Sequence, residues 1–185
     1  MKMYPSLLLN KIKQHLKRGG VIAYPTESCY GLGCDPFNFK AVNKIIKLKG
    51  RSKTKGMIVI AGDMLQLQNI ITPLSENEQH ELKKYWPGFY SLIMSANSRV
   101  LPNITGKNHK VAVRVTKHEL VRQLCCAVKM PLVSTSANRS GCKSIKSYKE
   151  CKRQFGRQVM VLPGIIGFAK SPSTIIDWQT KMILR

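Results

Sequence analysis

Acidic residues are scarce in this 185-residue sequence, where nine Asp and Glu stand against 31 Lys and Arg and give a formal net charge of +22. Such an excess says nothing about the fold, but it predicts attraction to polyanions such as RNA, nucleotides or acidic membranes. A solvated, lysine-rich surface without any partner is the alternative interpretation.

Long apolar runs and metal-binding patterns are missing too. No stretch of 18 apolar residues occurs, and the apolar run at 7–9 is too short for a signal peptide. The six cysteines include no CxxC pair, and the four histidines lack zinc-ligand spacing near them. We therefore expect a cytoplasmic protein with free thiols, no metal site and no membrane contact.

The length and the 43% content of hydrophobic residues suit one domain, 1–185, with a substantial core. Ser6 and Asn38 are candidate helix N-caps, and 26–37 is expected to be a loop in which Gly31 and Gly33 permit unusual backbone angles. Helices are predicted at 8–16, 38–49, 78–86, 118–128 and 148–155, and strands at 21–24, 57–60, 89–95, 111–115, 131–133, 159–162, 174–178 and 182–184. This alternation predicts an α/β sheet of mixed strand direction.

Lys49 occupies an unusual place in the predicted helix 38–49. Val42, Ile45 and Ile46 form an apolar stripe, and Lys49 follows Val42 by seven residues on the same helical face. A lysine there either extends its ammonium group to solvent or presents its charge to a ligand at the helix end.

Four segments, 24–28, 49–52, 134–141 and 171–174, concentrate hydroxyl, amide and cationic side chains. They lie at the ends of predicted strands or helices, where open α/β sheets usually bind ligands. Taken singly, each has an ordinary structural explanation, such as a strand exit, a Ser/Thr turn bonded to its own backbone, or a solvated pair of cations.

The order of motifs along the chain joins these segments into one candidate site. The motifs are GVIAYPTE at 20–27, YGLGCD at 30–35, Lys49-x-Arg51, WPG at 86–88, VRV at 113–115, Ser136-x-Asn138, STIID at 173–177 and the terminal ILR. In this order they resemble the YrdC/TsaC family of threonylcarbamoyl-AMP synthases over nearly the whole chain, and K-x-R with S-x-N is the most specific part.

The resemblance implies a single-domain, twisted, mixed open sheet flanked by helices, YrdC/RibB-like, with a concave ligand cleft. It also implies an enzyme, a nucleotidyltransferase that joins L-threonine, bicarbonate or CO2, and ATP into threonylcarbamoyl-AMP and pyrophosphate, the first step of the t6A modification of tRNA. Mg²⁺ would enter with ATP, since no dedicated acidic metal motif is visible. A transient contact with the downstream threonylcarbamoyl transferase complex is expected.

Ten positions match residues with roles in the family. Lys49, as a point charge, and Arg51, as a planar fork, would be the catalytic residues that stabilise phosphoryl charge. The nucleotide-binding set is Lys49, Arg51, Ser136, Asn138, Ser144 and Arg185, and the threonine-binding set is Thr26, Arg114, Ser134 and Ser173.

Two of these positions carry alternatives. Arg114 suits a bidentate grip on the threonine carboxylate, but a cross-strand ion pair would also explain it. Arg185 is the last residue, where fraying is expected.

Rival functions are less well supported by the residues. No nucleophile with a local His or Asp partner is recognisable, and Gly31-Leu32-Gly33 is neither a P-loop nor a dinucleotide fingerprint. The alternative from another class is a noncatalytic domain that binds double-stranded RNA or tRNA through its charge. Aromatics are only 7% of the chain, and no single-strand RNA motif with paired aromatics is present.

Overall fold

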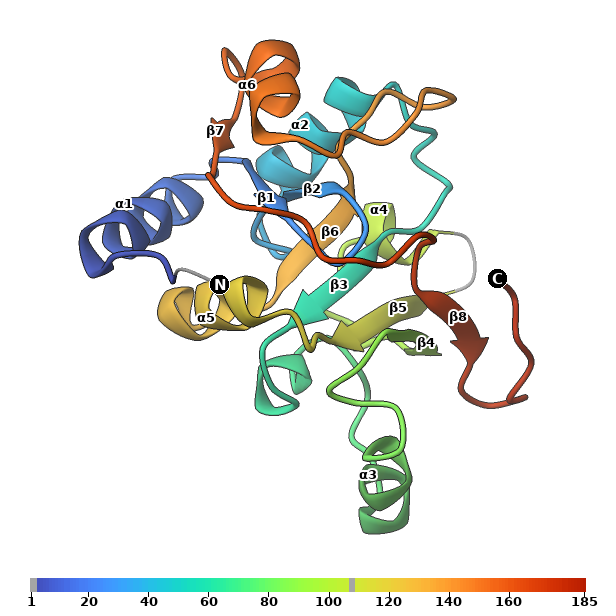
Figure 1. The fold of residues 1–185 in the computed structure, drawn as a ribbon. Helices are drawn as coiled ribbons and strands as arrows, with labels where there is room; N and C mark the ends of the chain where they lie inside the picture. Colours follow the sequence, from blue (N-terminus) through green and yellow to red (C-terminus); the bar gives the residue numbers. More distant parts are fainter. Residues whose placement is uncertain (1–2, 107–108) are drawn as a thin grey trace.

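A mixed sheet of eight strands organises the chain, as a computed structural model of residues 3–106 and 109–185 shows (Figure 1). Along the chain the elements are α1 (Ser6–Lys17), β1 (Ile22–Pro25), β2 (Tyr30–Gly33), α2 (Phe39–Lys49), β3 (Ile58–Ala61), the 3-10 turn η1 (Leu65–Leu67), α3 (Glu76–Leu82), β4 (Tyr90–Ser95), α4 (Pro102–Thr105), β5 (Lys110–Val115), α5 (Glu119–Val128), β6 (Leu132–Ser136), α6 (Tyr148–Phe155), β7 (Met160–Val161) and β8 (Thr174–Asp177).

The strand order is β7-β1-β2-β6-β3-β5-β4-β8. The pairs β1–β7, β3–β5 and β4–β8 are parallel, and the other four neighbouring pairs are antiparallel. The predicted α/β class and mixed strand direction are confirmed.

Helices cover both faces of the sheet, because alternate strand residues point to opposite sides. On one face α1 and α5 pack against each other and against β1, where Ile22 and Tyr24 are fully buried. Ala23 faces the other side, in a larger cluster that includes residues of α2, α4 and α6. The candidate site lies along β5 and at the ends of β1, β6 and β8.

Helix α2 follows the sequence prediction closely. The Asn38 side chain accepts a hydrogen bond from the Ala41 amide at 3.0 Å, which confirms Asn38 as the N-cap. The helix ends at Lys49, and Gly50 closes it in the left-handed conformation (φ 57°), where a Cβ would be strained. By contrast, Ser6 is not the cap of α1, because Pro5 takes that position and Ser6 is already helical.

The predicted loop 26–37 is wrong over Tyr30–Gly33, which form the buried strand β2, antiparallel to β1. Gly31 and Gly33 do not have positive φ values. What Gly33 provides is space, because a Cβ there would lie 2.7 Å from the Tyr24 ring and 2.8 Å from the Val133 oxygen.

Three other boundaries differ from the predictions. Strand β6 continues through Ser136, so Ser134 and Ser136 are strand residues and not part of a loop. Helix α3 ends at Leu82, and turns follow it. The predicted strand 182–184 is reduced to one isolated bridge, between Ile176 and Ile183.

Candidate functional site

A cavity of about 1510 Å³ opens where β1, β5, β6 and β8 meet the loop after α2. The strap, residues 163–173, connects β7 to β8 and crosses in front of the sheet (Figure 1). Eight of the ten predicted residues line this cavity, namely Thr26, Arg51, Arg114, Ser134, Ser136, Ser144, Ser173 and Arg185. Residues from seven separate parts of the chain are therefore brought together around one cavity.

Lys49 and Asn138, the other two predicted residues, are not among the residues that line this cavity, and they bind each other. The Lys49 ammonium donates to the main-chain oxygens of Ser136 at 2.5 Å and Asn138 at 2.8 Å, and to the Asn138 side-chain oxygen at 3.4 Å. The Asn138 amide nitrogen donates to the Arg139 and Cys142 oxygens at 2.9 and 2.7 Å. The K-x-R and S-x-N motifs are thus linked by direct hydrogen bonds.

The side chain of Lys49 is buried, with 3% exposure, so it does not extend to solvent. Burial, together with the nearby positive charge of Arg51, lowers its pKa to about 8. With a pKa of about 8, the Lys49 side chain loses its proton only slightly above neutral pH. Three oxygen acceptors replace the water that the ammonium group loses on burial.

Arg51 is anchored by its own loop. Its Nε donates to the Lys55 oxygen at 3.2 Å and its Nη2 to the Gly56 oxygen at 2.6 Å. These two bonds fix the guanidinium plane at the edge of the cavity, where the remaining donors can meet an anion.

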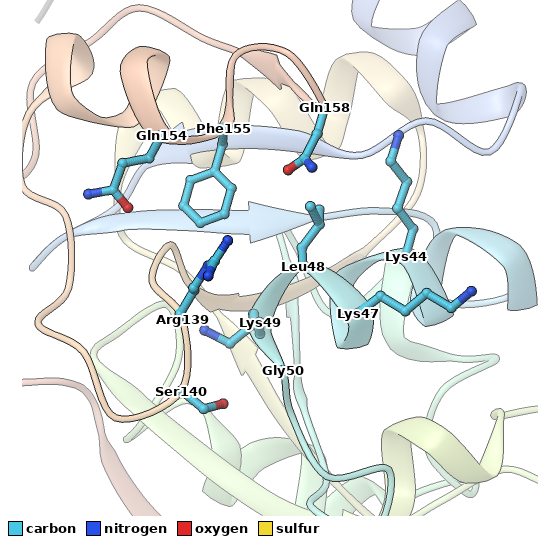
Figure 2. Close-up of a pocket in the computed structure, with 10 residues that line it drawn as sticks. All are labelled: Lys44, Lys47, Leu48, Lys49, Gly50, Arg139, Ser140, Gln154, Phe155 and Gln158. Atoms are coloured by element: carbon cyan, nitrogen blue, oxygen red, sulfur yellow. The ribbon is translucent and has the colours of Figure 1, made fainter.

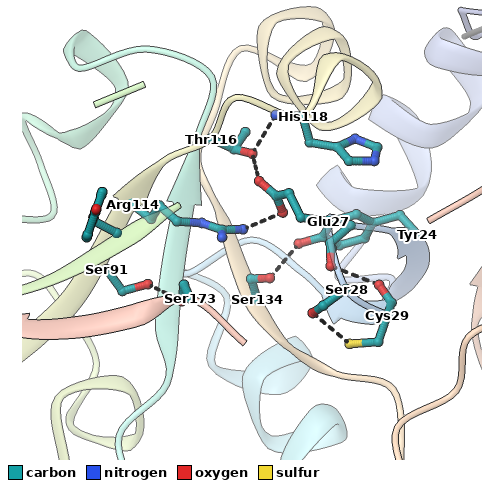
Figure 3. A network of polar contacts seen from close by, with 12 residues as sticks. Tyr24, Glu27, Ser28, Cys29, Ser91, Arg114, Thr116, His118, Ser134 and Ser173 are labelled. Atoms are coloured by element: carbon teal, nitrogen blue, oxygen red, sulfur yellow. Dashed lines mark hydrogen bonds and ion pairs between the residues drawn. The ribbon is translucent and has the colours of Figure 1, made fainter. Parts of the chain in front are cut away.

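Hydrogen bonds with nearby residues orient the hydroxyl groups at the ends of β1 and β6. Thr26 Oγ1 donates to the Cys29 oxygen at 2.8 Å. The fully buried Tyr24 hydroxyl donates to Ser134 Oγ at 2.9 Å, as Figure 3 shows, which leaves the Ser134 proton for another acceptor. Burial raises the pKa of the Cys29 thiol, against the effect of hydrogen bonds with Ser28 and Ser144.

Ser173 and Arg185 are placed together at the other end of the cavity. The hydroxyl of Ser173 lies 2.8 Å from that of Ser91, and both residues are buried. Arg185 donates from Nε and Nη2 to the Ser173 oxygen at 3.4 and 3.2 Å. Its own carbonyl accepts from the Ile175 amide at 2.9 Å, which ties this residue to β8.

Arg114 forms the ion pair that was the alternative to a carboxylate grip. Its Nη2 lies 2.9 Å from Glu27 Oε2, and Thr116 Oγ1 donates to Glu27 Oε1 at 2.7 Å (Figure 3). Arg114 is 6% exposed, and its buried Nε has no partner among the described residues. Since donors remain, the ion pair and a ligand carboxylate can share this guanidinium.

Sequence reasoning assigned no role to Glu27. Arg114, the partner of Glu27, is 87 positions away, and no local sequence pattern predicts an ion pair between residues so far apart. The one sequence signal for a role of Glu27 is its position directly after Thr26 in the motif GVIAYPTE at 20–27. Behind this pair, the backbone amide of His118 donates to Thr116 Oγ1 at 3.0 Å, which helps to orient the hydroxyl that bonds to Glu27.

A second cavity, of about 890 Å³, lies between α2 and α6 (Figure 2). Lys44, Lys47 and the predicted catalytic residue Lys49 line it from α2, Arg139 from the loop after β6, and Gln154 from α6. Cations from α2 and from the loop after β6 therefore lie around one cavity. No acidic residue is among those that line it.

Within 3–106 and 109–185, no group of three or more His, Cys, Asp or Glu side chains is placed to hold a metal ion. In the same residues, no helix has the length and apolarity needed to span a membrane. All six cysteines are free thiols.

Comparison with known sequences shows which family this chain is similar to. The family model Sua5_yciO_yrdC, described as "Telomere recombination", matches residues 14–185. A threonylcarbamoyl-AMP synthase of Chromobacterium violaceum is 46% identical over 180 residues, 97% of this chain and 93% of the relative. One of Neisseria meningitidis is 50% identical over 176 residues, 95% of this chain and 93% of the relative.

Solved structures support the same assignment. Sua5 of P. abyssi, crystallised with L-threonine, superposes with a TM-score of 0.88 at 28% identity. The match covers 96% of this chain but 53% of that one, so this chain spans about half of the longer protein. E. coli YciO shares the fold, with a TM-score of 0.84 at 24% identity over 98% of this chain and 89% of its own. The chain belongs to the Sua5/YciO/YrdC family.

Proposed function

We propose that this protein is a threonylcarbamoyl-AMP synthase, which joins L-threonine, bicarbonate or CO2, and ATP and releases pyrophosphate. The relatives that carry this name match nearly the full chain at 46 to 50% identity. The observation that carries the proposal is the gathering of eight separately predicted residues around one cavity. The comparisons support this enzyme and not the noncatalytic RNA-binding alternative.

L-Threonine is proposed to bind among Thr26, Ser134, Ser173 and Arg114. Hydroxyl groups there are already oriented by Tyr24 and Ser91, so little order has to be gained on binding. The P. abyssi protein, whose structure contains L-threonine, supports this amino acid as the ligand. The guanidinium of Arg114 suits its carboxylate.

The polyphosphate of ATP is proposed to lie toward Arg51, Ser136, Ser144 and Arg185. A carbamate oxygen attacks the α-phosphorus, the bond from that phosphorus to the bridging oxygen breaks, and pyrophosphate leaves with the electron pair. Negative charge then grows on the phosphoryl oxygens, and preorganised cations stabilise it. Arg51 supplies such a charge by contact.

Lys49 and Asn138 are proposed to act from outside this lining. All the hydrogen bonds of the Lys49 ammonium run to Ser136 and Asn138, so Lys49 fixes the turn that carries the polar groups. Because Lys49 is buried, water screens its positive charge only weakly, and this charge makes the electrostatic potential at the phosphate position more positive. Both effects are needed for the catalytic role predicted from the motif.

Mg²⁺ is proposed to enter as part of the ATP substrate and to share the phosphate charge, as the sparse acidic residues of the cavity suggest. The product is proposed to pass to a threonylcarbamoyl transferase complex for tRNA modification in the cytoplasm, a compartment in keeping with six free thiols. A direct contact with tRNA or double-stranded RNA is a separate proposal, supported by the +22 charge.

Pyrophosphate release tests the proposed reaction. Purified protein is given Mg-ATP, L-threonine and bicarbonate, and each is then omitted in turn. Release that depends on all three is the expected result. Release that ignores L-threonine would reject the substrate, and RNA affinity without any turnover would favour the noncatalytic alternative.

A further inference from the structure

Charge is distributed unevenly around the large cavity. Eight Lys and Arg side chains and three carboxylates line it. Two of the carboxylates, Glu27 and Asp177, pair with cations of the same strand, Arg114 and Lys110, each at 2.9 Å. Both ion pairs therefore lie along β5.

We call the surface formed by Lys110, Ala112 and Arg114 the β5 wall. These residues alternate along the strand, so their side chains point to the same face, and all three line the cavity. Each cation of the β5 wall has a carboxylate from another segment, Glu27 after β1 and Asp177 at the end of β8. The β5 wall thus has no net charge.

Five of the other six cations, all except Arg185, form what we call the cationic rim, namely Arg51, Lys55, Lys143, Lys146 and Lys170. None of them forms an ion pair within the described ranges 3–106 and 109–185. The remaining carboxylate of the cavity, Glu150, accepts only a hydrogen bond from Gln154, at 3.2 Å. The rim therefore keeps its full positive charge.

We propose that Glu27 and Asp177 determine which ligand occupies the β5 wall, so that it takes a zwitterionic amino acid and leaves the polyphosphate to the cationic rim. The proposal rests on the function argued above, in which both ligands share this cavity. A buried, unpaired arginine would otherwise bind phosphate as readily as a carboxylate.

Electrostatics explains the discrimination. At an effective dielectric constant of about 20, a carboxylate about 6 Å from one phosphate charge weakens binding by roughly a hundredfold before salt screening. A polyphosphate has several such charges, whereas a zwitterion has none in sum. Glu27 therefore costs the amino acid little and the polyphosphate much.

Arg114 keeps capacity for the amino acid. Glu27 occupies only its Nη2, and although Nε is buried, Nη1 is neither fully buried nor hydrogen-bonded to any described residue. Thr116 holds the second oxygen of Glu27 at 2.7 Å, so the carboxylate is fixed beside the guanidinium. Arg185, near Arg114 and without a carboxylate partner in the described chain, marks the border with the polyphosphate.

Competition between L-threonine and inorganic tripolyphosphate tests the proposal. The dissociation constant of L-threonine is measured by titration calorimetry with and without tripolyphosphate at constant ionic strength. In the parent protein, tripolyphosphate should change this constant by less than about threefold. In Glu27→Gln it should raise the constant roughly tenfold or more, because Arg114 is left unpaired.

Glu150→Gln is the matched control, since it removes the same charge from the same cavity without freeing a cation of the β5 wall. It should behave as the parent does. Equal competition in the parent, Glu27→Gln and Glu150→Gln would overturn the proposal. A parent protein without threonine-dependent pyrophosphate release would instead reject the proposed function.

Asp177→Asn supplies the test if Glu27→Gln does not fold, as judged by circular dichroism. Asp177 Oδ2 pairs with Lys110, whereas Oδ1 accepts from the Gln179 and Thr180 amides at 3.0 and 3.1 Å. Asparagine retains an oxygen for the two amides and loses the ion pair. Tripolyphosphate competition about threefold or more above the parent value is expected, and parental competition would overturn the proposal.

Discussion

Lys49 donates a hydrogen bond of 2.8 Å to the main-chain oxygen of Asn138, 89 positions further along the chain. The last residue of α2 is thereby tied to the turn that follows β6. A motif that looks like a phosphate-binding charge in the sequence is, in the structure, also a hydrogen-bond anchor.

Lys49→Met should damage both stability and turnover. Methionine fills similar space but leaves the oxygens of Ser136 and Asn138 without their donor in a buried place, which costs about 2 kcal/mol or more of unfolding free energy. Turnover should fall by about 10² or more because the turn and the positive charge are both lost. Urea unfolding and pyrophosphate release measure the two effects.

Lys47→Met is the control for that variant. Lys47 lies two residues earlier on α2 and is exposed, so its loss should change stability by less than about 0.5 kcal/mol. Near-normal turnover in Lys49→Met would show that the motif serves folding alone.

The pH dependence of Lys49 separates its two roles. Its pKa is lowered from 10.5 to about 8 in the folded protein, so between these values the unfolded chain retains a proton that the folded chain has released. The free energy of unfolding should therefore rise with pH across this window, relative to Lys49→Met. Turnover should fall above pH 8, as the charge is lost. Turnover that stays constant to pH 9 would contradict a role for the charge.

The helical periodicity of apolar residues predicted the burial of Lys49, which composition alone could not. The stripe of Val42, Ile45 and Ile46 placed it on the buried face of α2, and burial is what the structure shows. The Asn38 cap was also readable, because capping depends on local residues. Local signals of this kind predicted α2 and most strands.

Features that depend on contacts between residues far apart in the chain could not be predicted from the sequence. β2 was missed because Tyr30-Gly31-Leu32-Gly33 has a glycine at every second position, and its pairing with β1 and β6 decides the strand. The Glu27–Arg114 pair depends on the sheet order, which brings the end of β1 near β5. The tie between Arg185 and Ile175 likewise arises only from the tertiary fold.

Arg51→Lys should reveal whether charge suffices at that position. Lysine keeps the positive charge but cannot hold the oxygens of Lys55 and Gly56 with a planar fork. We expect turnover to drop by about tenfold in Arg51→Lys and by about 10² in Arg51→Ala. Equal loss in both would assign the effect to geometry alone, and full activity in Arg51→Lys would contradict a role for the fork.

Tyr24→Phe probes the threonine site without touching the cavity. Tyr24 does not line the cavity, yet its hydroxyl fixes Ser134 Oγ at 2.9 Å. Removing this bond should cost about 1 kcal/mol of stability and raise the threonine KM several-fold, while the ATP KM stays unchanged. Initial rates at varied concentrations of each substrate provide the measurement. A parallel rise in both KM values would mean that the β6 end has moved as a whole.

His118 should control stability at acidic pH. Both ring nitrogens are buried and lack partners among the described residues, and burial lowers the pKa of this imidazole despite the nearby Glu27. The neutral form is therefore favoured in the folded protein, and its contribution to stability is full above the ordinary value of 6.5. Below that value the unfolded chain takes up a proton that the folded chain resists, so stability decreases as the pH is lowered.

His118→Phe removes the titrating group and the two unpartnered nitrogens, and it keeps the main-chain amide that bonds to Thr116. Thermal unfolding from pH 7 to 5 should consequently show a smaller decline in Tm for His118→Phe than for the parent. A decline of the same size in both proteins would mean that other groups carry the acid sensitivity.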